Sequence, residues 1–427
     1  MRIAVIGGGL AGISAARFLK ELGPYEVSIL EMEQDLGGIC RTWQRPDGDR
    51  FEFGPHFFHS KYPAILDKIK PEIADISYPV DIYTKSLVGD VLYDYPVSID
   101  NVLALPYEQR VQVIDELHKT EMSELDEAKT FEQYVIALVG ETLFNIFFRR
   151  YTEKLWGLPV NEIPSSWAPQ RISFRKSDKR FFPDEWCVYF HGGIEDLIRY
   201  VRASAGAREV TGVKIRSIER ASSWRIVTED GHEEFDGVIS TIPITQTLEY
   251  LGATEINQLS YRSFIVMYQE IFKDEATPAD WIYFPEDKYT FTRIFEVKRF
   301  SQPAPVEGKS SITIEIPCAY GGDDLWSASD SELAALIQEQ LMATGLYTRN
   351  ELGSTEFVRR RYVYPINDLT SSEGVKKNLS ALTEYPGIIP AGRLGLFKYM
   401  NMDETIMRSM EAAEQAHKTW LGGQEDG

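Results

Sequence analysis

The first 31 residues alternate between short apolar runs and one amphipathic stretch. Residues 3–6 (Ile-Ala-Val-Ile) form an apolar run of the length expected for a buried parallel strand. Apolar positions then recur at helical spacing from Ile13 to Leu22, and residues 27–30 (Val-Ser-Ile-Leu) form a second short run. This strand–helix–strand order predicts a parallel βαβ unit at the start of an α/β fold.

The remaining pattern changes twice along the chain. Residues 98 to about 170 carry apolar positions mostly at helical spacing, whereas residues 264–272, 289–295 and 311–316 show the alternation typical of antiparallel strands. A strand ending at Pro390 and a helix over residues 402–417 close the chain. The order predicts a helical region, then a β-rich region, then a return to the first fold.

Glycines mark the turn between the first strand and the first helix. Gly7, Gly9 and Gly12 have G-x-G-x-x-G spacing, with Leu10 and Ala11 between them, and Glu31 follows about 20 residues later at the end of the second strand. Such glycines permit a tight turn and close approach of the backbone to a pyrophosphate, while the acid binds a ribose hydroxyl. The segment therefore predicts a dinucleotide-binding site.

Charge and composition narrow the choice of partners. The formal net charge is −20, which argues against nucleic acid or an anionic membrane as a partner. The chain has no run of 18 apolar residues, and the first strand begins too early to leave room for a signal peptide. Three cysteines without metal spacing suggest a reduced protein, so we expect a cytoplasmic location and no membrane span.

Two glycine-containing loops follow the first βαβ unit. Gly37 and Gly38 permit close approach to a cofactor, and Arg41 beside them could meet a phosphate or flavin edge. In Phe53-Gly-Pro-His-Phe-Phe-His59 a turn places His56 and His59 three residues apart. Because no third ligand is near, we expect no metal and favour a cofactor-facing loop.

The aromatic segment 144–156 allows two readings. Phe144, Phe147, Phe148, Tyr151 and Leu155 share one helical face, as a core stripe would. The stripe runs into Arg149-Arg150-Tyr151-Thr-Glu-Lys-Leu-Trp156, where bases and aromatics are interleaved. Such a sequence could instead stack a nucleobase and hold its phosphates.

Basic residues recur in the second half of the chain. Arg293 lies within an apolar strand-like run and could be a surface arginine paired with a carboxylate such as Glu296, or a residue that binds a phosphate. Of the consecutive arginines 359–361, at least one must point to solvent if they lie on a strand. Gly392 and Arg393 end the last strand, and the N-terminal turn of the following helix suits anionic groups.

Three sequence segments together resemble the UDP-galactopyranose mutase-like flavoproteins of the amine-oxidase and protoporphyrinogen-oxidase-like superfamily. They are Gly-Pro-His-Phe-Phe-His at 54–59, Phe-Phe-x-x-Tyr-Thr-x-Lys-x-Trp-Gly at 147–157, and Gly-Arg-Leu-Gly-x-x-x-Tyr-x-x-Met-Asp at 392–403. The resemblance implies an FAD cofactor, reduced for activity, with NAD(P)H as a candidate reductant. It also implies a nucleotide-sugar substrate and is compatible with a homo-oligomer.

The resemblance implies a reaction and its site residues. Reduced flavin N5 would attack the sugar C1 of a UDP sugar, and ring opening and reclosure would interconvert pyranose and furanose forms. The implied catalytic residues are Arg171, Arg293, His59, Tyr364 and Tyr399. The implied substrate-binding residues are Phe147, Phe148, Tyr151, Trp156, Arg171, Arg293, Tyr364 and Asn401. The implied cofactor-binding residues are Gly7, Gly9, Leu10, Ala11, Gly12, Glu31, Gly38, Arg41, Gly54, Pro55, His56, Val213, Gly392, Arg393, Tyr399, Met402 and Asp403.

The expected fold class is α/β, with a Rossmann-like FAD-binding domain, a helical domain and an antiparallel substrate sheet. The FAD-binding domain would comprise residues 1–95, 191–248 and 385–427. The helical nucleotide-binding domain would comprise residues 96–170, and the substrate sheet would take its first strand from 171–190 and the rest from 249–384.

One departure and two rival functions remain. The mutases usually have an acid two residues after Tyr399, where this chain has Asn401, so the sugar is left open. An FAD-dependent oxidase or desaturase of the amine-oxidase or protoporphyrinogen-oxidase type is the main alternative, and it predicts an apolar pocket without an arginine pair. A non-catalytic flavin-bound or nucleotide-sugar-binding protein is the third reading.

Overall fold

The computed structural model describes residues 1–120, 123–170, 172, 174, 178–182, 185–300 and 307–422. Its first layer is a parallel five-stranded sheet whose strand order is β10-β2-β1-β14-β20. The sheet is built from distant parts of the chain, since its strands are β10 (Arg208–Val210), β2 (Glu26–Leu30), β1 (Arg2–Ile6), β14 (Gly237–Ser240) and β20 (Ile388–Pro390). β1 and β2 are buried from their second residue onward, which explains their continuous apolar runs.

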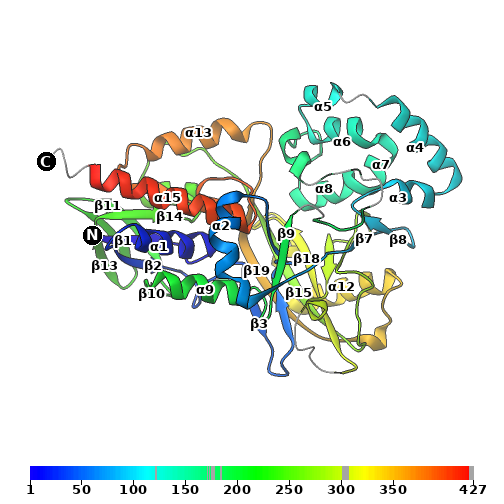
Figure 1. Cartoon of the computed structure of the whole chain (residues 1–427), viewed down its shortest axis with the longest axis horizontal. Helices are drawn as coiled ribbons and strands as arrows, with labels where there is room; N and C mark the ends of the chain where they lie inside the picture. Colours follow the sequence, from blue (N-terminus) through cyan, green and yellow to red (C-terminus); the bar gives the residue numbers. More distant parts are fainter. Residues whose placement is uncertain are drawn as a thin grey trace.

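Helices cover one face of this sheet and a small sheet covers the other. Helix α1 (Leu10–Leu22) packs against both α9 (Glu195–Ala205) and α15 (Met402–Gly422) (Figure 1). On the opposite face lies the antiparallel meander β11 (Ile215–Arg220), β12 (Trp224–Thr228) and β13 (Gly231–Phe235), which buries apolar side chains against β1 and β14. The layers are those of a dinucleotide-binding fold.

The second layer is a seven-stranded sheet with order β19-β15-β18-β17-β16-β7-β8. Its neighbouring strands are antiparallel except β16 and β7. The strands are β19 (Leu352–Pro365), β15 (Tyr261–Ile271), β18 (Ser310–Cys318), β17 (Arg293–Phe295), β16 (Trp281–Tyr283), β7 (Thr84–Val88) and β8 (Val91–Tyr95). Helix α12 (Asp330–Ala343) packs Leu333, Ile337 and Leu341 onto the apolar residues of this sheet.

A helical lobe adjoins the seven-stranded sheet, at the upper right in Figure 1. It contains α3 (Ile99–Ala104), α4 (Tyr107–Lys119), α5 (Ser123–Glu127), α6 (Phe131–Val139), α7 (Glu141–Leu143) and α8 (Arg149–Trp156). A π-helical turn, Phe144–Phe148, joins α7 to α8 and buries Phe144, Phe147 and Phe148. Such turns are rare and often lie at functional sites.

The remaining elements connect these layers. Strand β9 (Trp186–Phe190) lies between β5 (Phe58–Ser60) and β6 (Ser77–Pro79) in a small antiparallel sheet, and α2 (Pro63–Glu72) lies between β5 and β6 in the chain. Helices α10 (Ile244–Tyr250) and α13 (Ser371–Leu382) pack together, and the short α11 (Asp324–Ser327) and α14 (Gly392–Gly395) follow β18 and β20.

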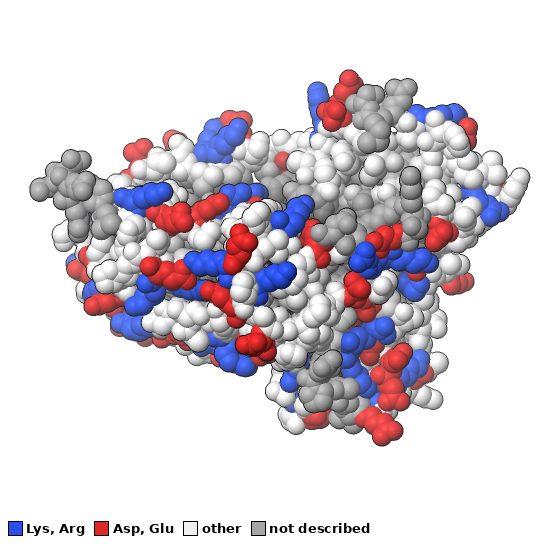
Figure 2. All heavy atoms as spheres, viewed as in Figure 1, with Lys and Arg blue, Asp and Glu red and all other residues white. Residues whose placement is uncertain are grey.

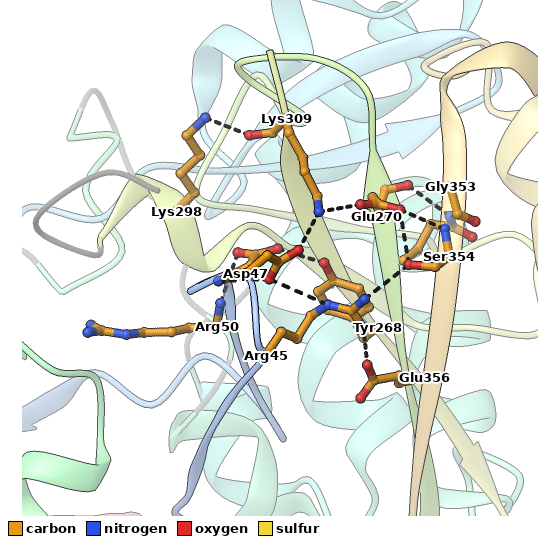
Figure 3. Close-up of polar contacts among 12 residues, drawn as sticks. Arg45, Asp47, Arg50, Tyr268, Glu270, Lys298, Lys309, Gly353, Ser354 and Glu356 are labelled. Atoms are coloured by element: carbon orange, nitrogen blue, oxygen red, sulfur yellow. Dashed lines mark hydrogen bonds and ion pairs between the residues drawn. The ribbon is translucent and has the colours of Figure 1, made fainter. Parts of the chain in front are cut away.

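A charged network fastens the hairpin β3–β4 (Thr42–Gln44 and Arg50–Glu52) to the seven-stranded sheet (Figure 3). The Lys309 ammonium pairs with both Asp47 of the hairpin loop and Glu270 of β15. Arg45 lies over the ring of Tyr268 at 4.7 Å, and the Tyr268 hydroxyl donates to buried Asp49 at 2.6 Å. Ion pairs and a ring contact therefore hold this hairpin against the seven-stranded sheet.

Charges are mixed over the molecular surface. On the face drawn in Figure 2, acidic and basic side chains are interspersed, and many form ion pairs. Along the residues that the structure describes, no helix combines the length and the apolar character needed to cross a bilayer.

Three segments differ from the sequence-based expectation, two in their strand partners and one in where its strand begins. Strands β7 and β8 fall within the predicted first part of the FAD-binding domain but belong to the seven-stranded sheet. Strand β9 falls within the predicted first strand of the substrate sheet but pairs with β5 and β6. The strand expected over 289–295 begins only at Arg293. Alternation identifies a strand but not its partner, because pairing is decided by contacts between distant residues.

Candidate functional site

The turn between β1 and α1 is closed by glycines that tolerate no side chain. A β-carbon on Gly12 would lie 1.9 Å from the Gly7 carbonyl oxygen, and one on Gly7, whose φ is +97°, would lie 2.4 Å from Thr241 Oγ1. Gly9 caps α1 without a side-chain hydrogen bond, so no side chain satisfies the first N–H groups of the helix, which begins at Leu10 and Ala11. This bare helix N-terminus is suited to a pyrophosphate.

The predicted cofactor residues from other segments surround this turn. Glu31 accepts a hydrogen bond from the Gly8 amide at 2.6 Å, and its carbonyl accepts one from the Val213 amide at 2.9 Å. A β-carbon on Gly38 would lie 3.2 Å from the Gly9 α-carbon, and one on Gly392 would lie 2.5 Å from the Ala11 β-carbon. The backbone thus forms a glycine-lined floor with an acid at its edge, which fits the pyrophosphate and ribose of FAD.

Two adjoining cavities lie between the dinucleotide-binding layers, the seven-stranded sheet and the helical lobe. Gly54, Pro55, His56, His59, Arg393, Asn401 and Met402 help to line the first cavity. Phe147, Phe148, Tyr151, Thr152 and Trp167 help to line the second. Both are lined by Phe181, Tyr283, Arg293, Glu315, Tyr364 and Tyr399. The predicted cofactor loop and the aromatic segment therefore meet at one shared wall.

Arg293 lies at that shared wall and forms a bidentate ion pair with Glu315. Its Nε and Nη2 donate to the two carboxylate oxygens at 3.0 and 2.6 Å, and the side chains are only 18% and 6% exposed. Burial opposes the charge, but the carboxylate raises the pKa of Arg293 above its usual value. Arg293 is therefore a fixed cation whose guanidinium also lies near the rings of Trp281 and Tyr283.

The carboxylate suggested by the sequence as a partner of Arg293 is engaged elsewhere. Glu296 is buried and accepts hydrogen bonds from the amides of Ala276 and Thr277 at 3.0 and 2.9 Å. Glu315 faces Arg293 across the paired strands β17 and β18. Arg293 is therefore paired with a carboxylate, as one of the two readings expected, but the partner is Glu315 at a cavity wall and not Glu296 at the surface.

Aromatic rings surround a second arginine. Arg393 donates to the carbonyls of Met400 and Val363, and its guanidinium lies 4.8 and 5.4 Å from the ring centres of Tyr364 and Tyr399. The Tyr364 and Tyr399 rings are 5.3 Å apart. Behind them lies Trp156, 5.9 and 6.1 Å from the two rings. Trp156 supports the tyrosines that line the cavity rather than lining it itself.

Each histidine of the cofactor loop faces a carboxylate. His59 Nδ1 is hydrogen-bonded to Glu185, and its ring stacks on Phe182 with 3.8 Å between centroids. The hydrogen bond from His59 lowers the pKa of Glu185. His56 Nδ1 lies 3.6 Å from Glu52, too far for a good hydrogen bond, and finds no partner among the described residues. Each histidine is therefore directed at a carboxylate of its own, and both extend the wall of the first cavity.

We expect the stability of the folded protein to fall as the pH rises, because His56 loses its proton. Burial disfavours the imidazolium, but the Cys40 sulfur and the Glu52 carboxylate favour it more and raise the pKa of His56 from 6.5 to about 9. A raised pKa adds stability that is complete below pH 6.5 and is lost as the pH rises through about 9, by up to ~3 kcal/mol. The melting temperature of the FAD-bound protein should therefore drop more between these pH values in the wild type than in His56→Gln. The exposed His118→Gln is the matched control, and an equal drop in both variants would contradict this role.

Other predicted residues take more varied positions. Arg41 pairs with Asp35 at 2.8 Å and lies over the Trp43 ring, without lining either cavity. Asp403 is buried in the first turn of α15, where burial raises its pKa against the opposing effect of His59. Arg171 lies outside the described residues.

Several residues at the shared wall were not predicted from the sequence. They are Glu315, Tyr283 and Phe181; Trp281, which lines only the first cavity, was also missed. A signal existed for Glu315, because it is the one charged residue in the buried strand Ser310–Cys318. A carboxylate on such a strand requires a buried partner. No comparable signal marks the aromatic residues, which resemble ordinary core positions.

Comparison with known proteins agrees with this geometry. The chain is similar to the probable UDP-galactopyranose mutase of Klebsiella pneumoniae, with 23% identity over 97% of this chain and 94% of the other. It is also similar to the dTDP-fucopyranose mutase of Escherichia coli, with 24% identity over 97% of both. A crystal structure of reduced UDP-galactopyranose mutase superposes with a TM-score of 0.83 at 21% identity, covering 98% of this chain and 95% of the other.

A protein-family model provides the assignment. The model described as flavin-containing amine oxidoreductase matches residues 10–365, which is well over half of the chain. The match begins at the glycine-lined floor and extends through the seven-stranded sheet, so it includes most of the cavity walls. The chain belongs to the family of flavin-containing amine oxidoreductases.

Proposed function

We propose that this protein is a flavin-dependent mutase that interconverts the pyranose and furanose forms of a nucleotide sugar. The observation that carries the proposal is the shared wall at Arg293. There, the cavity beside the cofactor loop opens toward a second cavity lined by Phe147, Phe148 and Tyr151. A ligand with an aromatic base, a diphosphate and a sugar matches the order of aromatic rings, buried cation and cofactor loop.

Reduced FAD would supply the nucleophile for the sugar in this reaction. The residues of the chain then have to bind and orient the substrate and to stabilise the departing diphosphate. Arg293 is positioned for the last task, because a buried guanidinium interacts strongly with developing negative charge. Tyr151, whose ring lies edge-to-face with Tyr283 at 5.2 Å between centroids, would hold the nucleotide end in place.

The cavity supports a mutase over the oxidase alternative. In an oxidase whose substrate is apolar, a buried arginine at the cavity wall would find no charged group on the substrate to bind. Here Arg293 and Arg393 both line the first cavity. The sugar mutases found in the comparison extend over nearly the whole chain and agree with this reading. The proposal names no particular sugar. Asn401, which stands where the mutases usually have an acid, also lines this cavity.

The proposal is tested by turnover of defined substrates. The FAD-bound protein is incubated with UDP-galactofuranose or dTDP-fucofuranose, with and without dithionite, and the products are separated by chromatography. We expect ring isomerisation of at least one substrate only when the flavin is reduced. Loss of sugar coupled to oxygen consumption would instead support an oxidase, and the absence of turnover with either sugar together with no binding of UDP or dTDP would contradict the proposal.

A further inference from the structure

Lys154 on α8 is engaged in an unusual set of contacts outside the cavities. Its ammonium donates to four backbone carbonyl oxygens, those of Phe284, Glu286, Tyr289 and Phe291, at 2.6, 2.9, 3.0 and 3.2 Å. An ammonium has three hydrogens, so four acceptors share them. The carbonyls converge on one point, and the lysine provides the cation that they surround.

These carbonyls all belong to the connection between β16 and β17. The connection begins immediately after Tyr283 and ends just before Arg293, and both of these residues line the two cavities. Its ends are held together by a hydrogen bond from the Phe284 amide to the Thr292 carbonyl at 2.9 Å. Whatever fixes this connection therefore also fixes the strand that carries Arg293.

The backbone of α8 is fastened to the same sheet from a different strand. Arg262 of β15 donates to the carbonyls of Lys154 and Leu155 at 2.8 and 2.9 Å, where the helix ends. Tyr151 lies one turn before Lys154 and lines the second cavity. Arg262 therefore holds the end of the helix, while the Lys154 side chain couples the helix to the Arg293 strand.

We infer that Lys154 is a positioning residue for nucleotide binding. Its ammonium, acting through the four carbonyls, fixes the spacing between the aromatic wall on α8 and the cation on β17. This inference rests on the proposed function, since it assumes that a nucleotide diphosphate spans both features. Lys154 itself touches neither cavity, so its effect on binding is indirect.

The surroundings of Lys154 both oppose and support its positive charge. Burial lowers the pKa of Lys154 to about 7, and the carboxylates of Asp287 and Glu286 oppose this shift. Both carboxylates have other cations beside them: Asp287 lies 3.3 Å from Arg150, and Glu286 lies 3.2 Å from Lys288. Among the described residues, the four carbonyls are thus the hydrogen-bond acceptors of the Lys154 ammonium.

Chemical rescue tests the inference. Lys154→Ala leaves the four carbonyls without their cation, and UDP should bind the FAD-loaded variant about tenfold more weakly or worse, as measured by calorimetry. Added n-propylammonium, which replaces the missing side chain, should restore most of the affinity. Tetramethylammonium should not, because it has no N–H to donate. A role in overall stability alone would change the melting temperature without this selective rescue.

Matched variants complete the design. Lys288→Ala removes a lysine of the same connection whose side chain is 46% exposed, and it should bind UDP as the wild type does. If Lys154→Ala does not fold, Lys154→Met keeps the chain length without the charge and should show the same loss of UDP affinity. UDP affinity equal to the wild type in a folded Lys154 variant, or weak binding of Lys154→Ala that n-propylammonium does not improve, overturns the inference. If the wild type itself binds neither UDP nor dTDP, the proposed function fails and this inference falls with it; if it binds only dTDP, the same variants are measured with dTDP.

Discussion

Gly12→Ala is expected to yield protein that is purified without FAD. The added methyl group would lie 1.9 Å from the Gly7 carbonyl oxygen, a distance that no side-chain rotation can relieve. The β1–α1 turn must open, which displaces the helix N-terminus that would bind the pyrophosphate. The measurement is the ratio of flavin absorbance to protein absorbance after purification, together with flavin affinity on reconstitution.

A second glycine provides the control for this result. The nearest heavy atom to a β-carbon on Gly322 is the Ala319 β-carbon at 4.0 Å, and Gly322 has no positive φ. Gly322→Ala therefore makes the same chemical change without a clash and should retain FAD. Full flavin occupancy in Gly12→Ala would mean that the cofactor does not depend on this turn.

Arg293→Met is expected to lower turnover by about 10²–10³ while FAD remains bound, since the loss of one preorganised charge at a reacting group has effects of this size. The matched control is Arg359→Met on the same sheet, because Arg359 pairs with Asp330 and lines neither cavity. The measurement is kcat with the nucleotide sugar that the wild type isomerises. Turnover within a few-fold of the wild type would remove Arg293 from the chemistry.

The buried partner of Arg293 requires a second variant. Removing the arginine alone leaves Glu315 buried without a counter-ion, and breaking such a pair can cost 3–5 kcal/mol by itself. The double variant Arg293→Met with Glu315→Gln removes both charges and should recover thermal stability without recovering turnover. Recovery of turnover in the double variant would show that the first loss came from misfolding.

The dinucleotide-binding fold could be predicted because its signal is local. The close contact between Gly12 and the Gly7 carbonyl oxygen determines the turn within a few residues of the chain, and the structure contains that contact. Arg293 was likewise identifiable from the sequence, because an arginine within an apolar run stands out. Its partner was not, because Glu315 is brought opposite it by the pairing of β17 with β18.

Strand partners were the least predictable part of the fold. β7 and β8 have ordinary alternating sequences, and nothing in residues 84–95 indicates that β7 pairs with β16, almost 200 residues later. The role of Trp156 also depended on tertiary packing. It was predicted to line the nucleotide pocket, but the structure places it behind Tyr364 and Tyr399. Helical spacing fixes which face of a helix a residue occupies and not which ring reaches the cavity first.

The interleaved strand order of the parallel sheet has a consequence for biosynthesis. β1 and the glycine-rich turn are made first, but Gly392, which lies against Ala11, and α15, which packs on α1, are made only after residue 391. A nascent chain that ends before Gly392 lacks elements that complete the flavin site. Cofactor loading therefore requires synthesis to proceed beyond Gly392, and a protein truncated before β20 should accumulate as an unloaded folding intermediate.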